Sequence, residues 1–285
     1  MTQLAVTGYA SLDYPLMLDG VVAGNRTTHI RFRDPDAWPR PGGSPSYVGV
    51  AARRGGVAAA PVTWIGEDAL GALFADHCRA HGLVAEGIET HAGARSPAAI
   101  MIQQADGTTA CLYDPALAGR ERLSPAQARV IARADHLCVT VGPGHLIGDI
   151  LAVRGPDAPL SWVMKDDPTC FDAANRAALG ARARIVFCNS AEHRLIADVV
   201  RSDALVVETL GAEGVRLHRA GKTTVLPAAA IAVADPTGAG DSFAGAFLAA
   251  HLGGALPEHA ARKAMDAVRA MLAERAEQEK ERGRA

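Results

Sequence analysis

The sequence lacks several features that would point to particular classes of protein. It has no excess of basic charge, since 29 Lys and Arg residues against 31 Asp and Glu residues give a formal net charge of −2. That balance gives no reason to expect nucleic acid as a partner. The longest apolar runs are broken by glycine or charge well before the roughly 20 residues that a membrane span needs. We therefore expect neither nucleic acid nor a membrane among its partners.

The cysteines and histidines lack the spacing of a structural or metal site. The 5 cysteines are scattered and odd in number, and the 10 histidines form no HExxH-like pair. This pattern argues against both a disulfide framework and a zinc site. Met1–Val6 has no charged region of a signal peptide and is typical of a first strand. We expect buried free thiols and a cytoplasmic protein. The cysteines are Cys78, Cys111, Cys138, Cys170 and Cys188.

What the sequence does contain is an alternation of strand-like apolar runs with helix-period segments through most of its 285 residues. This alternation predicts an α/β fold, with a parallel sheet and crossover helices. The expected strands are Leu4–Thr7, Val62–Ile65, His136–Val141, Leu160–Val163, Ile185–Cys188 and Ala204–Thr209. The expected helices are Ser46–Arg54, Leu70–His81, Pro125–Ala132, Ala191–Ala197 and Asp241–Leu252.

Two stretches do not fit this alternation. Tyr14–Arg33 mixes apolar and polar residues, and Ala98–Tyr113 alternates around Asp106-Gly107, which is a strong hairpin signal. Short strands inserted at the carboxyl edge of a parallel sheet would form a small lid over the place where ligands bind. A closing lid suits a kinase, because a kinase must exclude water from a reactive phosphoryl group.

The C-terminal stretch Ala260–Ala285 is helix-forming and highly charged after Leu272. It could be a helix that binds a partner, or a solvated helix with a frayed tail. We favour the second interpretation.

The most informative stretch is Asp235–Asp241, with the sequence DPTGAGD, followed at once by a helix of small residues. Backbone amides at a helix start have no intrahelical partner and form an anion site. A carboxylate at that point places a proton acceptor beside a hole built for negative charge, which suits phosphoryl transfer to an alcohol. The alternative is simple helix capping, because the helix dipole alone favours an Asp in the first turn.

Several motifs together resemble the ribokinase-like (PfkB) family of sugar and nucleoside kinases, over nearly the whole chain. The resemblance implies one kinase domain over residues 1–285, with a three-layer α/β/α fold, a mostly parallel central sheet and a small β-strand lid. The lid would be formed by two inserted segments, about residues 14–33 and 97–114. The motifs are Asp235–Asp241, Gly42-Gly43-Ser44-Pro45, Asn189-Ser190-Ala191-Glu192, Thr209-Leu210-Gly211-Ala212-Glu213-Gly214 and Gly66-Glu67-Asp68-Ala69-Leu70-Gly71.

The resemblance also implies roles on the side of the nucleotide. Asp241 would accept the proton of the substrate hydroxyl, and the amides of Gly238, Ala239 and Gly240 would stabilise charge on the transferred group. Glycine permits the close approach of backbone to phosphate. Thr209, Gly211 and Gly214 would bind the nucleotide. Asn189 and Glu192 would bind a hydrated Mg²⁺. The carbonyls of Asp235 and Thr237 would bind a monovalent cation such as K⁺.

Without the family match, an Asn-x-x-Glu pair is more often a helix cap. Lys165, after the strand Leu160–Val163, is our hypothesis for a phosphate contact, and a solvated loop lysine is the alternative.

On the substrate side, Asp13 matches a sugar-hydroxyl acceptor of the family, and Gly42 and Gly43 would let the substrate lie on the backbone. Ser11 and Tyr47 stand where ribokinases usually carry Asn, which makes ribose itself doubtful. The Tyr47 ring could stack on a ring or base of the substrate, or pack under the lid.

The sequence thus predicts ATP-dependent phosphorylation of a primary hydroxyl of a small sugar or sugar derivative. The alternatives are a nucleoside kinase, for which Tyr47 is the main hint, and a non-catalytic sugar-binding protein of the same fold. Relatives often dimerise through the lid, so a homodimer is compatible with the apolar run Ala98–Ile102. The stretch Ala264–Ala273 is predicted as continuous helix where relatives usually place an adenine-binding loop, so adenine contacts cannot be carried over.

Overall fold

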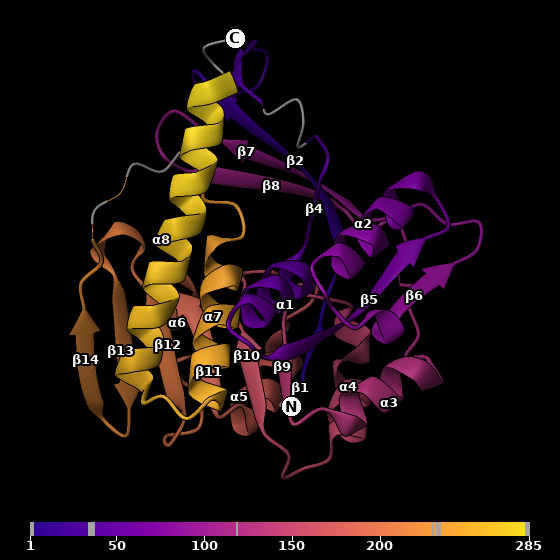
Figure 1. The fold of residues 1–285 in the computed structure, drawn as a ribbon, viewed down its shortest axis with the longest axis vertical. Coiled ribbons are helices and arrows are strands. Elements are labelled where there is room, and N and C mark those ends of the chain that lie inside the picture. Colours follow the sequence, from indigo (N-terminus) through magenta and orange to yellow (C-terminus); the bar gives the residue numbers. More distant parts are fainter. Residues whose placement is uncertain (1–2, 34–37, 118, 230, 232–234, 283–285) are drawn as a thin grey trace.

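The computed structural model describes residues 3–33, 38–117, 119–229, 231 and 235–282. A nine-stranded central sheet lies below a five-stranded lid sheet in Figure 1. The central order is β14-β13-β12-β11-β10-β9-β1-β5-β6, parallel from β6 to β12 and antiparallel beyond. The bounds are β1 (Gln3–Thr7), β5 (Ala58–Gly66), β6 (Ile88–His91), β9 (His136–Val139), β10 (Leu160–Val163), β11 (Ile185–Asn189), β12 (Leu205–Thr209), β13 (Val215–Arg219) and β14 (Lys222–Leu226).

Helices cover both faces of the central sheet, because its buried strands send alternate side chains to opposite sides. In β1, Leu4 and Val6 join the core under one helical layer and Ala5 joins the core under the other. This is the predicted three-layer α/β/α architecture. One layer holds α1 (Ser44–Arg54), α2 (Ala69–Ala80), α7 (Ala239–Leu252) and α8 (Pro257–Arg282), and the other holds α3 (Pro125–Arg133), α4 (Ile147–Arg154), α5 (Ala173–Arg182) and α6 (Ser190–Ile196).

The lid sheet joins both inserted segments of the chain. It contains β2 (Ser11–Leu18), β3 (Ile30–Phe32), β4 (Arg40–Gly42), β7 (Ala98–Gln103) and β8 (Thr109–Asp114). The predicted hairpin is confirmed, since β7 and β8 pair antiparallel around Gly107 at φ 84°. The first segment is longer than residues 14–33. It begins at Ser11 because β2 follows β1 almost directly, and it ends with β4 at the di-glycine.

The C-terminal helix α8 packs along α7 and does not stand free in solvent (Figure 1). Ala260, Ala261 and Ala264 are fully buried and Leu272 nearly so, because small side chains let the two helices approach closely. The predicted helix over Ala264–Ala273 is confirmed, whereas the interpretation of the segment as a solvated helix is wrong for this part of it. Residues 283–285 lie outside the described residues. No helix of the described ranges is both long and apolar enough to cross a bilayer.

Candidate active site

The Asp235–Asp241 turn opens helix α7 at the carboxyl end of the central sheet. Gly238 is the N-cap of α7 in the left-handed conformation, with φ 75° and ψ 5°, which glycine adopts without a steric penalty. Among the residues that the structure describes, no group accepts from the amides of Gly238 and Gly240. The Ala239 amide differs from the prediction, because it donates to the Pro236 carbonyl at 2.9 Å. Of the three amides in the predicted anion site, those of Gly238 and Gly240 are therefore the free donors.

Asp241 lies in the first turn of α7 and is 7% exposed. Its Oδ1 atom is buried and has no hydrogen-bond partner in the described part of the chain. A buried carboxylate oxygen normally has a donor, and none of the described residues supplies one to this atom. The role of Asp241 as proton acceptor stays a prediction.

Lys165 lies beside this carboxylate, just beyond the end of β10. A Cβ placed on Gly240 would be 4.0 Å from the Lys165 Nζ atom, so the ammonium faces the start of α7. The charge of Asp241 raises the pKa of Lys165 against the opposing effect of burial, and Glu192 adds to the rise. The lysine thus lies beside Asp241 and the start of α7, and its phosphate contact stays a prediction. It does not line the cavity described below.

Asn189 and Glu192 form a capping box at the start of α6, as the alternative interpretation of this pair predicted. The Asn189 Oδ1 atom accepts from the amides of Ala191 and Glu192 at 2.9 Å each. The Glu192 Oε2 atom accepts from the Asn189 amide at 2.8 Å. Burial raises the pKa of Glu192. The cap fixes the Glu192 carboxylate near Lys165 and Asp241 and leaves its second oxygen free of the cap.

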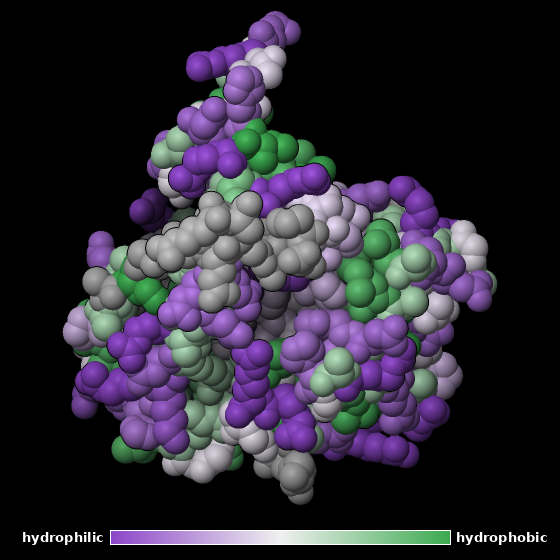
Figure 2. Space-filling model, turned by 45° about the horizontal axis from the view of Figure 1, so that its top comes forward, coloured by the Kyte–Doolittle hydropathy of each residue, from purple (hydrophilic) through white to green (hydrophobic). Residues whose placement is uncertain are grey.

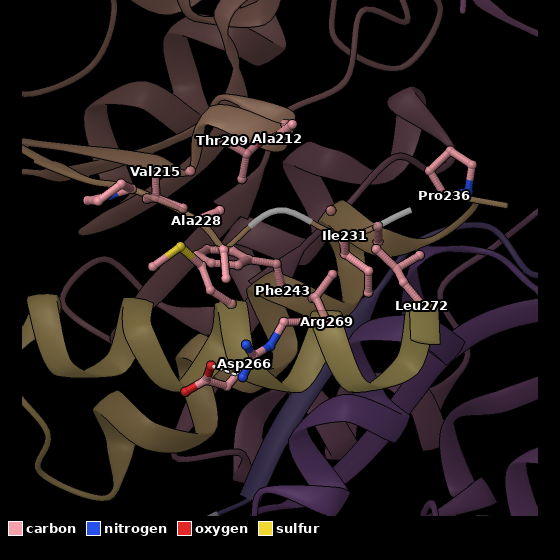
Figure 3. Close-up of a pocket in the computed structure, with 18 of the residues that line it drawn as sticks. Thr209, Ala212, Val215, Ala228, Ile231, Pro236, Phe243, Asp266, Arg269 and Leu272 are labelled. Atoms are coloured by element: carbon pink, nitrogen blue, oxygen red, sulfur yellow. Dashed lines mark hydrogen bonds and ion pairs between the residues drawn. The ribbon is translucent and has the colours of Figure 1, made fainter. Parts of the chain in front are cut away.

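A cavity of about 460 Å³ lies between the β12–β13 connection, α7 and α8 (Figure 3). The predicted nucleotide residues Thr209, Gly211 and Gly214 line it, and Ala239 and Gly240 connect it to the anion site. Sequence reasoning did not find its other lining residues, because α8 reaches the cavity only through tertiary packing. Among them are Phe243, Met265, Val268 and Leu272, with Arg262, Asp266 and Arg269 from the same C-terminal helix.

Asp13, which we predicted to bind the substrate, lies within the lid strand β2 and is 4% exposed. Ser11 Oγ donates to its Oδ1 atom at 2.6 Å, and the Tyr47 hydroxyl donates to its Oδ2 atom at 2.8 Å. Burial raises the pKa of Asp13. The two residues that replace asparagine in this chain thus both bind this carboxylate. They hold Asp13 in place at the edge of the lid.

The di-glycine makes room for protein groups in addition to any ligand. A Cβ on Gly42 would lie 2.1 Å from Asp13 Oδ2, and a Cβ on Gly43 would lie 2.4 Å from the Tyr9 carbonyl oxygen. Gly43 also has φ 80° at the N-cap of α1. In the structure, Gly42 of β4 leaves room for the Asp13 carboxylate and Gly43 leaves room for the Tyr9 carbonyl. The predicted contact of these glycines with the substrate stays a prediction.

Tyr47 connects the substrate side to the phosphate side. Its hydroxyl is bound to Asp13, and a Cβ on Gly238 would lie 2.7 Å from three atoms of its ring. One face of the ring therefore packs on the glycine that caps α7. Of the two roles considered for this ring, the contacts support packing.

Asp235 is held by three side chains that sequence reasoning did not identify. Arg40 of β4 pairs with its Oδ2 atom at 2.8 Å, and Gln103 of β7 donates to its Oδ1 atom at 3.1 Å. Arg275 of α8 lies 3.8 Å from its Oδ2 atom. Burial alone would raise the pKa of Asp235, but Arg40 and the Thr237 hydrogen bonds outweigh burial and lower it. The lid and the C-terminal helix thus meet at the first residue of the turn.

The predicted cation ligands are the carbonyls of Asp235 and Thr237. Both accept from Arg275 Nη1, at 3.2 Å and 2.7 Å respectively. Within the described residues, no group of three or more His, Cys, Asp and Glu side chains is placed to hold a metal ion.

The central sheet with helices on both faces and the small lid sheet together define a ribokinase-like kinase fold. The sequence profile of the pfkB family carbohydrate kinases matches residues 1–279, so the chain belongs to this family of kinases. An acarbose 7(IV)-phosphotransferase from an Actinoplanes species is 29% identical, with 76% of this chain and 75% of that protein covered.

Solved structures with the same fold include a ribokinase from Cryptococcus neoformans var. grubii in complex with ADP, at 21% identity and a TM-score of 0.79. The match covers 93% of this chain and 92% of that one. A nucleoside kinase from Burkholderia thailandensis in complex with inosine is also 21% identical, with a TM-score of 0.79 and 95% and 91% of the two chains covered.

Proposed function

We propose that this kinase transfers the γ-phosphate of ATP to a primary hydroxyl of a small sugar or sugar derivative, with Asp241 as the base. The observation that carries the proposal is the buried Asp241 carboxylate, whose Oδ1 atom has no partner among the described residues and which lies between two features. On one side lies the cavity of Figure 3, which Gly240 helps to line. On the other side lie Tyr47 and Asp13. An acceptor hydroxyl between them would be within reach of the carboxylate.

The chain's own groups account for the steps of transfer. Asp241 takes the proton of the attacking hydroxyl, the free amides of Gly238 and Gly240 stabilise charge on the transferred phosphoryl group, and Lys165 adds a positive charge beside them. The lid excludes water from the site.

Mg²⁺ would supply charge neutralisation on the ATP phosphates. The buried Glu192 carboxylate suits a hydrated Mg²⁺, because this ion keeps most of its waters and needs few direct protein ligands.

A coupled assay of ADP release tests this function with a panel of sugars, sugar phosphates, nucleosides and acarbose. Acarbose is included because the chain is similar to the Actinoplanes acarbose 7(IV)-phosphotransferase. We expect one or more carbohydrates to stimulate ADP release. If no carbohydrate does so, this proposal fails, and stimulation by a nucleoside alone would favour the nucleoside kinase. A nucleoside kinase is the alternative, for which Tyr47 is the main hint, and one face of the Tyr47 ring packs on Gly238.

Replacement of the proposed base gives the first specific prediction. Asp241→Asn keeps the size of the side chain but cannot accept the proton, so we expect kcat to fall by ~10²–10⁴-fold. Binding of ATP, followed by calorimetry, should change little because the nucleotide cavity is untouched. A variant that keeps more than a few per cent of the wild-type rate would show that another group is the base.

We also propose that the protein forms a homodimer through the lid. The lid sheet exposes the side chains of Ile30, Ile100 and Leu112 by 53%, 41% and 58%, and Ile100 and Leu112 are paired neighbours on β7 and β8. Hydrophobic residues gather at the upper end of the molecule in Figure 2, where Figure 1 places the lid. Sedimentation of the wild type and of Leu112→Glu tests this. A monomeric wild type would contradict it.

A further inference from the structure

The C-terminal helix delivers a guanidinium to the backbone of the Asp235–Asp241 turn. Arg275 lies one helical turn beyond the buried Leu272, so both side chains point from α8 toward α7 and the turn. The Arg275 side chain is 18% exposed. Its Nη1 atom donates to the carbonyls of both Asp235 and Thr237. A single cationic atom thus joins two carbonyls that are two residues apart.

These carbonyls do not fit a monovalent cation while Arg275 is in place. A cation bound by the same two oxygens would lie next to the guanidinium, and two positive charges at that separation in a partly buried site repel each other. The Asp235 carboxylate does not offset this repulsion, because Arg40 already pairs with it at 2.8 Å. The charge that an ion would bring is already supplied by the protein.

We propose that Arg275 replaces a monovalent cation in holding the turn, so that this kinase needs no such ion for activity. The inference rests on the proposed function, in which the amides of Gly238 and Gly240 stabilise the transferred group. Thr237 immediately precedes these glycines, so the Arg275 hydrogen bonds fix the backbone that aims them. Arg275 is therefore a positioning residue.

The continuity of helix α8 explains why Arg275 reaches the Asp235–Asp241 turn in this chain. α8 runs without a break from Pro257 to Arg282, so its packing on α7 carries Arg275 to the turn. A loop at Ala264–Ala273 would interrupt the helix and remove the alignment of Leu272 and Arg275 on one face.

The test compares the wild type, Arg275→Met and the matched control Lys263→Met, which replaces an exposed basic residue of the same helix. Rates are measured in K⁺, Na⁺ and tetramethylammonium chloride at equal ionic strength. We expect the wild type and Lys263→Met to show the same kcat in all three salts. For Arg275→Met we expect kcat to fall by about 10²-fold, since a shift of about 1 Å in catalytic groups has that effect. The KM for ATP should change little, and K⁺ should restore part of kcat.

A second readout separates this inference from the proposed function. The thermal midpoint of each variant is measured in the same three salts with no substrate present. We expect a K⁺-specific rise for Arg275→Met and none for the wild type. A wild type whose midpoint or kcat rises specifically with K⁺ overturns the inference, as does an unchanged kcat in Arg275→Met. Failure to find any acceptor leaves the thermal test decisive, and it counts against the proposed function alone.

Discussion

At the scale of single residues, the candidate site depends on glycines whose backbone lies so close to a neighbouring group that a Cβ would not fit. Gly238 shows this most sharply, because it combines a left-handed φ of 75° with the ring of Tyr47 on its Cα. This contact joins the start of α7 to the residue that binds Asp13, beside the contacts of Arg40 and Gln103 with Asp235. A methyl group there would separate the start of α7 from the residue that holds Asp13.

We predict that Gly238→Ala lowers the free energy of unfolding through two separable contributions, one from the backbone and one from the contact with Tyr47. The left-handed backbone costs a non-glycine residue about 1–2 kcal/mol, and overpacking against the ring costs about 1–3 kcal/mol more. In a Tyr47→Ala background the second amount should disappear. Urea unfolding of the single and double variants measures both.

Gly254 provides the control for this experiment. Its φ is 95°, but a Cβ there would meet nothing within 4 Å. Gly254→Ala should therefore show only the backbone cost, whether or not Tyr47 is present. Equal costs for Gly238→Ala and Gly254→Ala would mean that the Tyr47 contact has no energetic weight.

The residue scale also shows what sequence can and cannot predict about a site. Asp241 could be predicted as a proton acceptor because the pattern that indicates this role, a glycine turn that runs into a helix, is local in the sequence. Arg40, Gln103 and Arg275 could not be found in this way. They come from β4, β7 and α8, and only the fold brings them to Asp235.

At the scale of secondary structure elements, the turn Gly66-Glu67-Asp68-Ala69-Leu70-Gly71 connects the start of α2 to the lid. Asp68 is the N-cap of α2, and its Oδ1 atom accepts from the Gly71 amide at 2.8 Å. The same carboxylate accepts from the Ser96 amide at 2.8 Å and from Ser96 Oγ at 2.6 Å. Ser96 lies two residues before β7, so this cap also fixes where the lid strand begins.

We predict that Asp68→Ala lowers the free energy of unfolding by about 2–3 kcal/mol, because it removes a helix cap and two further hydrogen bonds to a charged group. Asp172→Ala is the matched control, since Asp172 caps α5 through the Asn175 amide alone and should cost about 1 kcal/mol. Both values come from urea unfolding. If the two variants lose the same amount, the connection to Ser96 contributes nothing.

Elements with strong local signals were predicted from sequence, and elements without them were missed. All six expected central strands are present, but β5 extends back to Ala58 through alanines that have little strand preference of their own. The short helix α4 has no side-chain cap, so nothing in its sequence marks its start. α5 could have been found, because Asp172 is a typical N-cap residue before a helical run.

At the scale of the whole molecule, burial of ionisable groups makes stability depend on pH. His136 begins β9, is 3% exposed, and its Nε2 atom has no partner among the described residues. Burial lowers the pKa of His136 to about 3. Burial and the neighbouring His81 lower the pKa of His77 to about 4. Both rings therefore stay neutral in the folded protein at a pH where an unfolded chain would protonate them.

We predict that the free energy of unfolding falls as the pH is lowered from about 6.5, the ordinary histidine pKa, toward these folded values. The unfolded state binds more protons in this range, and each such histidine adds a slope of up to about 1.4 kcal/mol per pH unit. Urea unfolding between about pH 7 and pH 5 measures the slope, above the range in which most carboxylates titrate.

His136→Leu keeps an apolar group in the core and removes one proton site, so its slope should be about half that of the wild type. The exposed His259 supplies the control, because His259→Gln should leave the slope unchanged. A slope in His136→Leu equal to that of the wild type would contradict this assignment.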